Sequence, residues 1–176
     1  MKELTSRLKK IQLIALDVDG ILTNCQITLD SVGEWRRSFC LRDGYGLKML
    51  TDAGYQTALI TASKAKDIQE RAKVLQINHF HSGNLDKYSE LQKLMSTTGL
   101  KAEQIAYMGD DLFDIPALRF VGFAATVPNT IDEMAGYVHY VTKFPGGNGA
   151  VREVCDLILR HGPHGSAVWD RHFRGY

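Results

Sequence analysis

Several features that would assign this chain of 176 residues to a special class are missing from it. The 3 cysteines, Cys25, Cys40 and Cys155, form no CxxC pair, which argues against a disulfide framework or a zinc site and for a reducing compartment. A net charge of only +1 provides no electrostatic reason to expect nucleic acid or an anionic membrane as a partner. No apolar run approaches the roughly 20 residues that a membrane-spanning helix needs. These absences predict a cytoplasmic domain that binds neither nucleic acid nor membrane.

Targeting signals and repeats are also missing. The first residues are basic, but Asp17 interrupts the short apolar stretch that follows, so we expect no signal peptide. The composition, 44% hydrophobic and 23% charged, is that of an ordinary folded domain. The length suits one domain with a sizeable core. We predict a single domain over residues 1–162, followed by a tail, 163–176, in which no clear period is found.

What the sequence does contain is an alternation of short apolar runs with segments of helical periodicity. Strands are predicted at 11–16, 55–61, 104–111 and 121–127, with weaker candidates at 77–83 and 137–142. Helices are predicted at 44–54, 64–76, 86–99, 113–122 and 149–162. Strands that are apolar throughout and alternate with helices predict an α/β fold, a Rossmann-like, doubly wound parallel sheet covered on both faces.

One segment interrupts this alternation. Residues 24–40 alternate loosely in polarity around a turn at 30–33. The pattern predicts a β-hairpin that extends outside the main sheet.

Polar side chains stand where the predicted strands end. Asp17 and Asp19 follow the first strand, Thr61 ends the second, and Asp110 follows "IAYM". In folds of this class, ligands bind beyond the carboxyl ends of the strands. Carboxylates gathered there would repel one another without a cation, and oxygen-rich sites of this kind suit Mg²⁺. With the hydroxyl of Thr61 and the ammonium of Lys87 nearby, the edge would form a cradle for phosphate oxygens.

These residues carry a family resemblance. The segments "DVDGILT" and "GDDLFD", with Thr61 and Lys87 between them, resemble the four ordered motifs of the haloacid-dehalogenase-type phosphatases. The resemblance implies that Asp17 is the nucleophile and forms an aspartyl-phosphate. It also implies that Asp19 is the general acid and then the general base, while Thr61 and Lys87 bind the phosphoryl group.

The same resemblance implies how a magnesium ion would be held. Asp17, Asp110 and the backbone carbonyl of Asp19 would bind Mg²⁺, and Asp111 and Asp114 would orient these ligands from behind. Phosphoryl transfer depends mainly on positioning and charge neutralisation, which such a site supplies.

The spacing of the motifs leaves no room for a cap domain. One hairpin and one helix fill the stretch from Asp19 to Thr61, and one helix and one strand fill each later gap. An uncapped site needs another source of shielding, and a neighbouring subunit that contacts the 24–40 hairpin is the simplest one. Capless members of this family commonly form tetramers, so we expect a homotetramer with active sites near the subunit interfaces.

A narrower resemblance covers residues 8–162 and includes "FCLRDGYGLKML" and "GGNGAVREVCDLIL". It is to the capless subgroup that hydrolyses 3-deoxy-D-manno-octulosonate (KDO) 8-phosphate, a small-molecule sugar phosphate, for lipopolysaccharide biosynthesis. The substrate-binding residues that this resemblance implies are Asp19, Cys40, Leu41, Arg42, Asp43, Gly44, Lys48, Ser63, Arg71 and Lys87. Arginine and lysine among them suit an acidic sugar, whose carboxylate needs a cationic partner.

Three positions depart from that subgroup. Cys40, Lys48 and Ser63 stand where it usually has Asn, Arg and Arg. The 9-phosphate of a nine-carbon, sialic-acid-like sugar therefore stays open as an alternative substrate.

Two other classes of protein use part of this pattern. A signalling receiver domain also combines Asp, Thr or Ser, Lys and Mg²⁺ on a parallel sheet, but its phosphorylated Asp follows a central strand, where this chain has none. A non-catalytic oligomerisation module would not need both Asp17 and Asp19.

Overall fold

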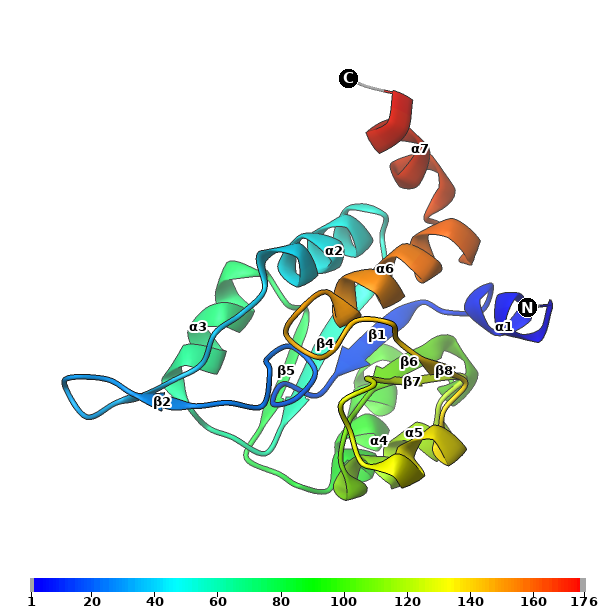
Figure 1. The fold of residues 1–176 in the computed structure, drawn as a ribbon. Helices are drawn as coiled ribbons and strands as arrows, with labels where there is room; N and C mark the ends of the chain where they lie inside the picture. The colour runs from blue at the N-terminus through cyan, green and yellow to red at the C-terminus, as the bar shows by residue number, and fades with distance from the viewer. Residues whose placement is uncertain (1, 175–176) are drawn as a thin grey trace.

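A parallel β-sheet runs through the centre of the computed structural model, which describes residues 2–174 (Figure 1). Within these residues the sheet has six strands in the order β5-β4-β1-β6-β7-β8, and every neighbouring pair is parallel. The strands are β1 (Leu13–Leu16), β4 (Gln56–Thr61), β5 (His79–Ser82), β6 (Ile105–Met108), β7 (Phe123–Thr126) and β8 (Tyr140–Val141). The predicted α/β class with a doubly wound sheet is confirmed, and no cap domain is found among the described residues.

Helices cover both faces of the sheet. The α-helices are α1 (Lys2–Leu8), α2 (Leu41–Asp52), α3 (Lys66–Val74), α4 (Lys87–Thr98), α5 (Ile115–Phe120), α6 (Ala150–His161) and α7 (Ser166–Arg174). Three 3₁₀ helices join them: η1 (Ala102–Gln104), η2 (Leu112–Asp114) and η3 (Asp132–Tyr137). One hydrophobic cluster unites residues of α1, α2, α3 and α6, whereas a second unites those of α4 and α5. In Figure 1 these two groups lie on opposite sides of the sheet.

Strand β1 explains why the first apolar run has no polar alternation. Leu13 and Ala15 belong to the cluster under α4 and α5, whereas Ile14 and Leu16 belong to the cluster under α2 and α6. Successive side chains of a strand point to opposite faces, so a central strand with two cores must be apolar at every position.

The register of β1 places the polar residues at one edge. Leu16 is paired with Leu59 of β4 and with Met108 of β6. The loops that leave β1, β4 and β6 therefore start at the same level, and the side chains of Asp17, Thr61 and Asp110 lie at the carboxyl edge of the sheet.

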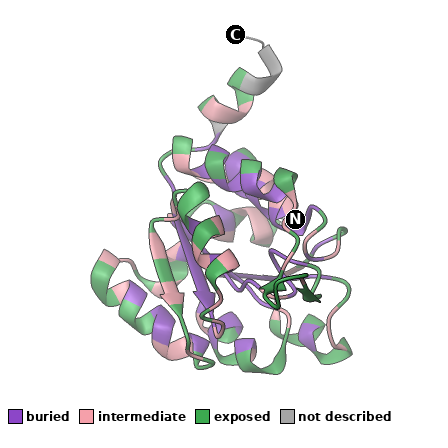
Figure 2. Cartoon of the chain, turned by 90° about the vertical axis from the view of Figure 1, so that its left-hand side faces the viewer, coloured by how far each residue is buried: buried purple, intermediate pink, exposed green. Residues whose placement is uncertain are grey.

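The predicted hairpin is confirmed as a separate two-stranded antiparallel sheet of β2 (Thr28–Leu29) and β3 (Trp35–Arg36). The carboxylate of Asp30 accepts hydrogen bonds from the amides of Val32 and Glu34, at 3.0 and 2.8 Å, which closes the turn. Figure 1 shows the hairpin projecting from the body of the molecule, and both of its strands are exposed (Figure 2).

Two helices lie where none was predicted. Helix α1 precedes β1, and α7 occupies most of the stretch expected to be a tail without a period. Trp169 of α7 packs against the larger hydrophobic cluster, and the guanidinium of Arg160 lies 4.2 Å from the centre of its ring. Short helices depend on such tertiary contacts, which a local pattern does not reveal. Among the described residues, no helix combines the length and the apolar composition that crossing a membrane would require.

Candidate active site

The carboxylate of Asp17 is buried at the end of β1 and is paired with an equally buried lysine. The Nζ atom of Lys87, the first residue of α4, lies 2.5 Å from Asp17 Oδ1 and donates a second hydrogen bond to the Ile60 carbonyl at 2.8 Å. A buried charge is tolerated only when it is paired and hydrogen-bonded. The pair joins the ends of β1 and β4 to the start of α4, as the motif order predicts.

Two further carboxylates approach Asp17. Oxygen atoms of Asp17, Asp110 and Asp114 all lie within 4.8 Å of one another. The oxygens of Asp114 are already occupied: Oδ1 accepts from the Tyr107 hydroxyl at 2.6 Å, and Oδ2 accepts from the amides of Asp110 and Asp111 at 3.0 and 3.2 Å. Asp114 therefore orients the loop after β6 from behind.

Asp110 differs from Asp114 in one respect. Its Oδ1 atom is buried and has no hydrogen-bond partner among the described residues. A buried oxygen without a hydrogen-bond partner is unfavourable unless a bound ligand contacts it. A carboxylate oxygen left free beside another carboxylate is the donor set that a hard divalent cation takes.

The electrostatics of the cluster support this interpretation. Burial, together with the charge of Asp114, raises the pKa of Asp17 from 3.8 to about 7, and Lys87 only partly opposes this. Burial and the charge of Asp17 raise the pKa of Asp110 to about 8. The pKa of Asp114 is also raised by burial. A cation between these groups would remove the repulsion that raises the pKa values.

Glycines make this close approach possible. Gly20 has φ = +92°, and a Cβ atom built on it would lie 1.8 Å from Asp110 Oδ2. A Cβ atom on Gly109 would lie 2.4 Å from the carboxylate carbon of Asp114. Gly20 therefore lets the loop after β1 approach Asp110, and Gly109 leaves room for Asp114 within the loop after β6.

The second carboxylate of "DVD", Asp19, lies at the rim and is partly exposed. Its oxygens accept hydrogen bonds from Arg37 Nε at 2.6 Å and from Arg37 Nη2 at 3.1 Å. Arg37 was not predicted to belong to the site. The sequence shows two adjacent arginines in the hairpin and does not reveal which of them turns inward.

The hydroxyl residues follow β4. Thr61 is buried, and its Oγ1 atom accepts a hydrogen bond from the Ser63 amide at 3.1 Å. The hydroxyl of Ser63 lies 3.4 Å from Arg37 Nη2. Both residues thus lie at the same edge as Asp17 and Asp19, although their roles in binding stay predictions.

Asp111 was predicted to help orient the metal ligands, and that role stays a prediction. The residue is exposed, and its Oδ1 atom accepts from the Leu112 amide at 2.7 Å, which caps η2. Only its backbone amide contributes behind the cluster, through the hydrogen bond to Asp114.

The predicted substrate-binding residues of α2 lie in varied surroundings. Asp43 is buried, and its carboxylate accepts from the amides of Gly149 and Arg152 at 3.2 and 2.8 Å, so it holds the start of α6. Leu41 is exposed, and the exposed Lys48 pairs with Asp52 at 2.6 Å. These contacts describe the residues without the substrate, and their part in binding stays a prediction.

Cys40, Gly44 and Arg71 meet where α2 and α3 come together. The Nη2 atom of Arg71 donates to the Cys40 carbonyl at 3.3 Å, and its guanidinium lies 5.5 Å from the centre of the Phe39 ring. A Cβ atom on Gly44 would lie 2.5 Å from that same Nη2 atom. The absence of a side chain at Gly44 thus makes room for Arg71.

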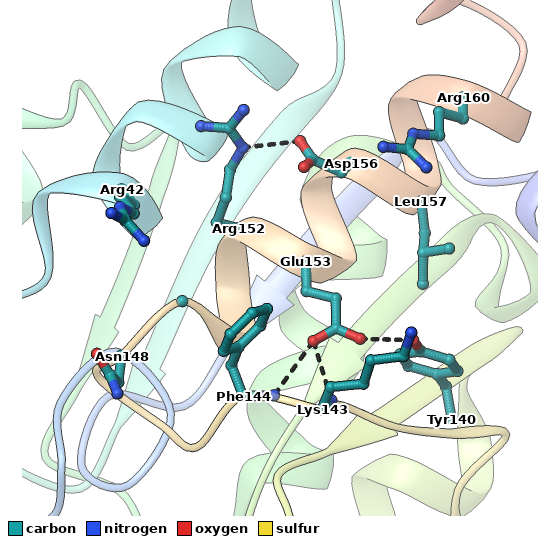
Figure 3. A pocket seen from close by; sticks show the side chains of 11 residues that line it. Arg42, Tyr140, Lys143, Phe144, Asn148, Arg152, Glu153, Asp156, Leu157 and Arg160 are labelled. Atoms are coloured by element: carbon teal, nitrogen blue, oxygen red, sulfur yellow. Dashed lines mark hydrogen bonds and ion pairs between the residues drawn. The ribbon is translucent and has the colours of Figure 1, made fainter.

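Arg42 lines a different hollow of the surface (Figure 3). It is a cavity of about 310 Å³ between the start of α2, the loop after β8 and α6, and Lys143, Arg152 and Arg160 also line it. In Figure 3 the Glu153 side chain points down to the loop, where it accepts from Tyr140 and from two backbone amides. None of the residues of the carboxylate cluster is part of this lining.

Comparison with known proteins finds a matching family profile and several similar phosphatases. A profile described as haloacid dehalogenase-like hydrolase matches residues 75–154. The chain is similar to the 3-deoxy-D-manno-octulosonate 8-phosphate phosphatase KdsC of Yersinia pestis, with 40% identity over 157 residues, 89% of this chain and 84% of that protein. It is 36% identical to the protein of the same name from Escherichia coli K12 over the same shares of both chains.

Solved structures resemble this one over nearly its whole length. The phosphatase of that name from Moraxella catarrhalis, crystallised with a magnesium ion, a phosphate ion and KDO, superposes with a TM-score of 0.92. It has 40% identity, and the match covers 97% of this chain and 98% of that one. The cobalt-bound phosphatase from Haemophilus influenzae superposes with a TM-score of 0.84 at 38% identity, over 88% of this chain and 91% of that one.

Proposed function

Because this chain belongs to the haloacid dehalogenase-like hydrolases, in the family of the 3-deoxy-D-manno-octulosonate 8-phosphate phosphatases, we propose that it hydrolyses KDO 8-phosphate to KDO and phosphate. The observation that carries the proposal is the buried pair of Asp17 and Lys87 beside Asp110 Oδ1, which has no partner among the described residues. We further infer that the free sugar acid is used for lipopolysaccharide biosynthesis.

In the first step, a carboxylate oxygen of Asp17 attacks the phosphorus and the bond to the sugar oxygen breaks. Lys87 lies 2.5 Å from Asp17 and offsets the negative charges that come together. The hydroxyl of Thr61 faces the same edge and is suited to hold a phosphoryl oxygen. The product of this step is an aspartyl-phosphate on Asp17.

Asp19 handles the protons of both steps. It donates one to the departing sugar oxygen and then takes one from the water that attacks the aspartyl-phosphate. Its partly exposed position at the rim is accessible to both the leaving oxygen and the water.

The carboxylates fit a magnesium ion. Asp17 and Asp110, with the backbone carbonyl of Asp19, would hold it, because Asp110 Oδ1 is buried without a partner among the described residues and Asp114 is fully engaged behind. When bound, the ion supplies positive charge to the clustered carboxylates and to the phosphoryl oxygens.

The sugar carboxylate needs a cation apart from the phosphoryl site. Of the three predicted for it, Lys48 is paired with Asp52, and Arg42 lines a cavity apart from the carboxylate cluster. Arg71 donates to the Cys40 carbonyl, but its buried Nε atom has no partner among the described residues. Arg42 and Arg71 are therefore the two candidates for the group that meets the carboxylate.

Assembly would complete the open site. The hairpin exposes Ile27, Leu29, Val32 and Trp35, and Leu29 lies directly opposite Trp35 in the register. A small hairpin with this much exposed apolar surface is typical of a contact between chains. We propose a homotetramer in which these hairpins meet and shield the active sites.

The proposal is tested by following phosphate release with KDO 8-phosphate, the 9-phosphate of a sialic-acid-like sugar and glucose 6-phosphate, each with Mg²⁺ and with a chelator. We expect the highest kcat/KM for KDO 8-phosphate and loss of release in the chelator. Preference for the nine-carbon sugar phosphate would make that compound the proposed substrate in place of KDO 8-phosphate. Phosphate release from none of the three would contradict the proposed function.

A further inference from the structure

The two adjacent arginines of the hairpin have different surroundings. Arg36 closes β3, its side chain is 47% exposed, and it pairs with Asp30 and Glu34 inside the hairpin. The next residue, Arg37, is 8% exposed, and its partners are Asp19 and Asp67, which come from other elements. Neighbouring residues in extended chain point to opposite sides, so one arginine faces the solvent and the other faces the site.

Arg37 grips the carboxylate of Asp19 with two nitrogens. Nε lies 2.6 Å from Oδ1 and Nη2 lies 3.1 Å from Oδ2. A planar guanidinium that binds both oxygens fixes the plane of the carboxylate as well as its position. A carboxylate has about four acceptor sites, so this grip leaves about two for a leaving oxygen or a water molecule.

Arg37 is itself held in place from α3. The Nη1 atom donates to both oxygens of Asp67, at 3.2 and 3.4 Å, and the Arg37 amide donates to Asp67 Oδ2 at 3.0 Å. Asp67 also accepts from the Ile68 amide at 2.8 Å, which ties it to the first turn of α3. The backbone and the side chain of Arg37 are therefore both anchored to a rigid helix.

We propose that Arg37 is a positioning residue that holds the carboxylate of Asp19 in the orientation needed for proton transfer. The inference rests on the proposed function, in which Asp19 serves the leaving oxygen and then the water. Proton transfer requires the donor to lie within hydrogen-bond reach, and a misplacement of about 1 Å costs about a hundredfold in rate. The base of the hairpin thus becomes part of the catalytic arrangement.

The test compares Arg37→Gln and Arg37→Lys with Arg36→Gln, a matched control in the same hairpin. For phosphate release from the sugar phosphate, we expect kcat of Arg37→Gln to fall about a hundredfold with KM changed less than about threefold. The kcat of Arg37→Lys should be at least about tenfold higher than that of Arg37→Gln, because the lysine ammonium can still contact Asp19. Arg36→Gln should match the wild type.

A second readout separates positioning from a general disturbance. The rate of phosphoenzyme formation is measured by rapid quench with a series of aryl phosphates, from good to poor leaving groups. A good leaving group such as p-nitrophenolate departs without a proton, so Arg37→Gln should slow it less than about threefold and should slow the poorest leaving group most. A uniform loss across the series, or a rise in KM with kcat unchanged, would overturn the proposal.

Two controls keep the outcomes distinct. Asp67→Asn removes the anchor and leaves Arg37, so it should give the same pattern with a smaller loss, and it replaces Arg37→Gln if that variant does not fold. The aryl series does not depend on the sugar. A wild type inactive on KDO 8-phosphate but active on aryl phosphates would contradict the proposed substrate alone, and the slope of the series would still decide the role of Arg37.

Discussion

The carboxyl edge of the sheet and the hairpin depart from the usual distribution of residues in opposite ways. At the sheet edge, Asp17, Lys87 and Asp114 are ionisable and buried. In the hairpin, Leu29 and Trp35 are apolar and exposed. A buried charge and an exposed apolar patch are each unfavourable in an isolated chain. Both regions fit the proposals made above, in which a cation and a phosphoryl group bind at the edge and a second chain covers the hairpin.

The two regions are linked by one side chain. Arg37 leaves the hairpin just after β3 and ends at Asp19. In the proposed tetramer, a change in the contact between hairpins would reach the rim of the site through Arg37. The proposed assembly and the proposed chemistry would therefore share one structural element, the hairpin.

The largest effect is expected at the buried carboxyl edge of the sheet. Asp17→Asn removes the nucleophilic oxygen, and kcat should fall by about a thousandfold or more. Phosphate release and the quenched phosphoenzyme measure the loss, and circular dichroism checks the fold. Asp132→Asn, on the exposed η3 helix, is the control and should retain full activity. Turnover that persists in Asp17→Asn would show that Asp17 is not the nucleophile.

At the exposed end, the double variant Leu29→Ser and Trp35→Ser should break the assembly. The two side chains lie opposite each other across the hairpin, so the variant loses a continuous apolar patch. Light scattering should show the mass fall from four chains to one. Val74→Ser, at an even more exposed apolar position on α3, should keep the tetramer. A wild type that is already monomeric would refute the proposed assembly.

Comparing Gly20→Ala with Gly33→Ala distinguishes an effect on the proposed metal ligand Asp110 from an effect of backbone strain. The new Cβ would lie 1.8 Å from Asp110 Oδ2, so Asp110 must move, and the affinity for Mg²⁺ should fall at least about tenfold. Gly33→Ala is the matched control, since Gly33 also has a positive φ, +81°, with no atom within 4 Å of the new Cβ. Titration calorimetry measures both variants. Equal affinities would show that Asp110 is not a ligand.

The raised pKa values predict how Mg²⁺ stabilises the fold at different pH. The pKa values of Asp17 and Asp110 rise from 3.8 in an unfolded chain to about 7 and about 8. Between pH about 4 and pH about 8, the metal-free fold therefore binds more protons than the unfolded chain. Stability from these groups is full below pH about 4 and is lost as the pH rises to about 8. Mg²⁺ prefers the deprotonated carboxylates.

The gain in Tm on adding Mg²⁺ should therefore be near zero at pH 5 and about 5 °C at pH 8.5. Scanning calorimetry measures the two gains. Asp110→Asn should remove most of the difference. A gain that is the same at both pH values would contradict a metal site among these carboxylates.

The smallest effect is expected at α7. Trp169→Ala removes a ring that packs against the large cluster and under Arg160, and stability should fall by about 1 kcal/mol. Urea unfolding measures this change. Leu85→Ala, an exposed apolar residue, should leave stability unchanged. No loss in Trp169→Ala would show that the ring adds nothing to the fold.

Much of the site could be predicted from residues that end strands. Asp17, Thr61 and Asp110 follow apolar runs, and parallel strands bring their carboxyl ends together, so the local pattern was enough to place them. Lys87 was proposed as a cation for the same edge, and Asp114 was named only through the resemblance to a known family. Arg37 was missed, because its role depends on Asp67 and Ser63, which lie about thirty residues away in sequence. Likewise, the contact of Asp43 with the start of α6 was not predicted, and its part in substrate binding stays a prediction.

The sequence by itself determined the class of fold, the edge of the sheet where the carboxylates stand and the hairpin outside it. These follow from periodicity and strand order, which are local properties of the chain. Only the tertiary structure decided which oxygen of the cluster has no partner among the described residues, which of two adjacent arginines contacts Asp19 and that residues 166–174 form a helix. Those outcomes depend on partners for charges and apolar surfaces, and such partners come from distant parts of the chain.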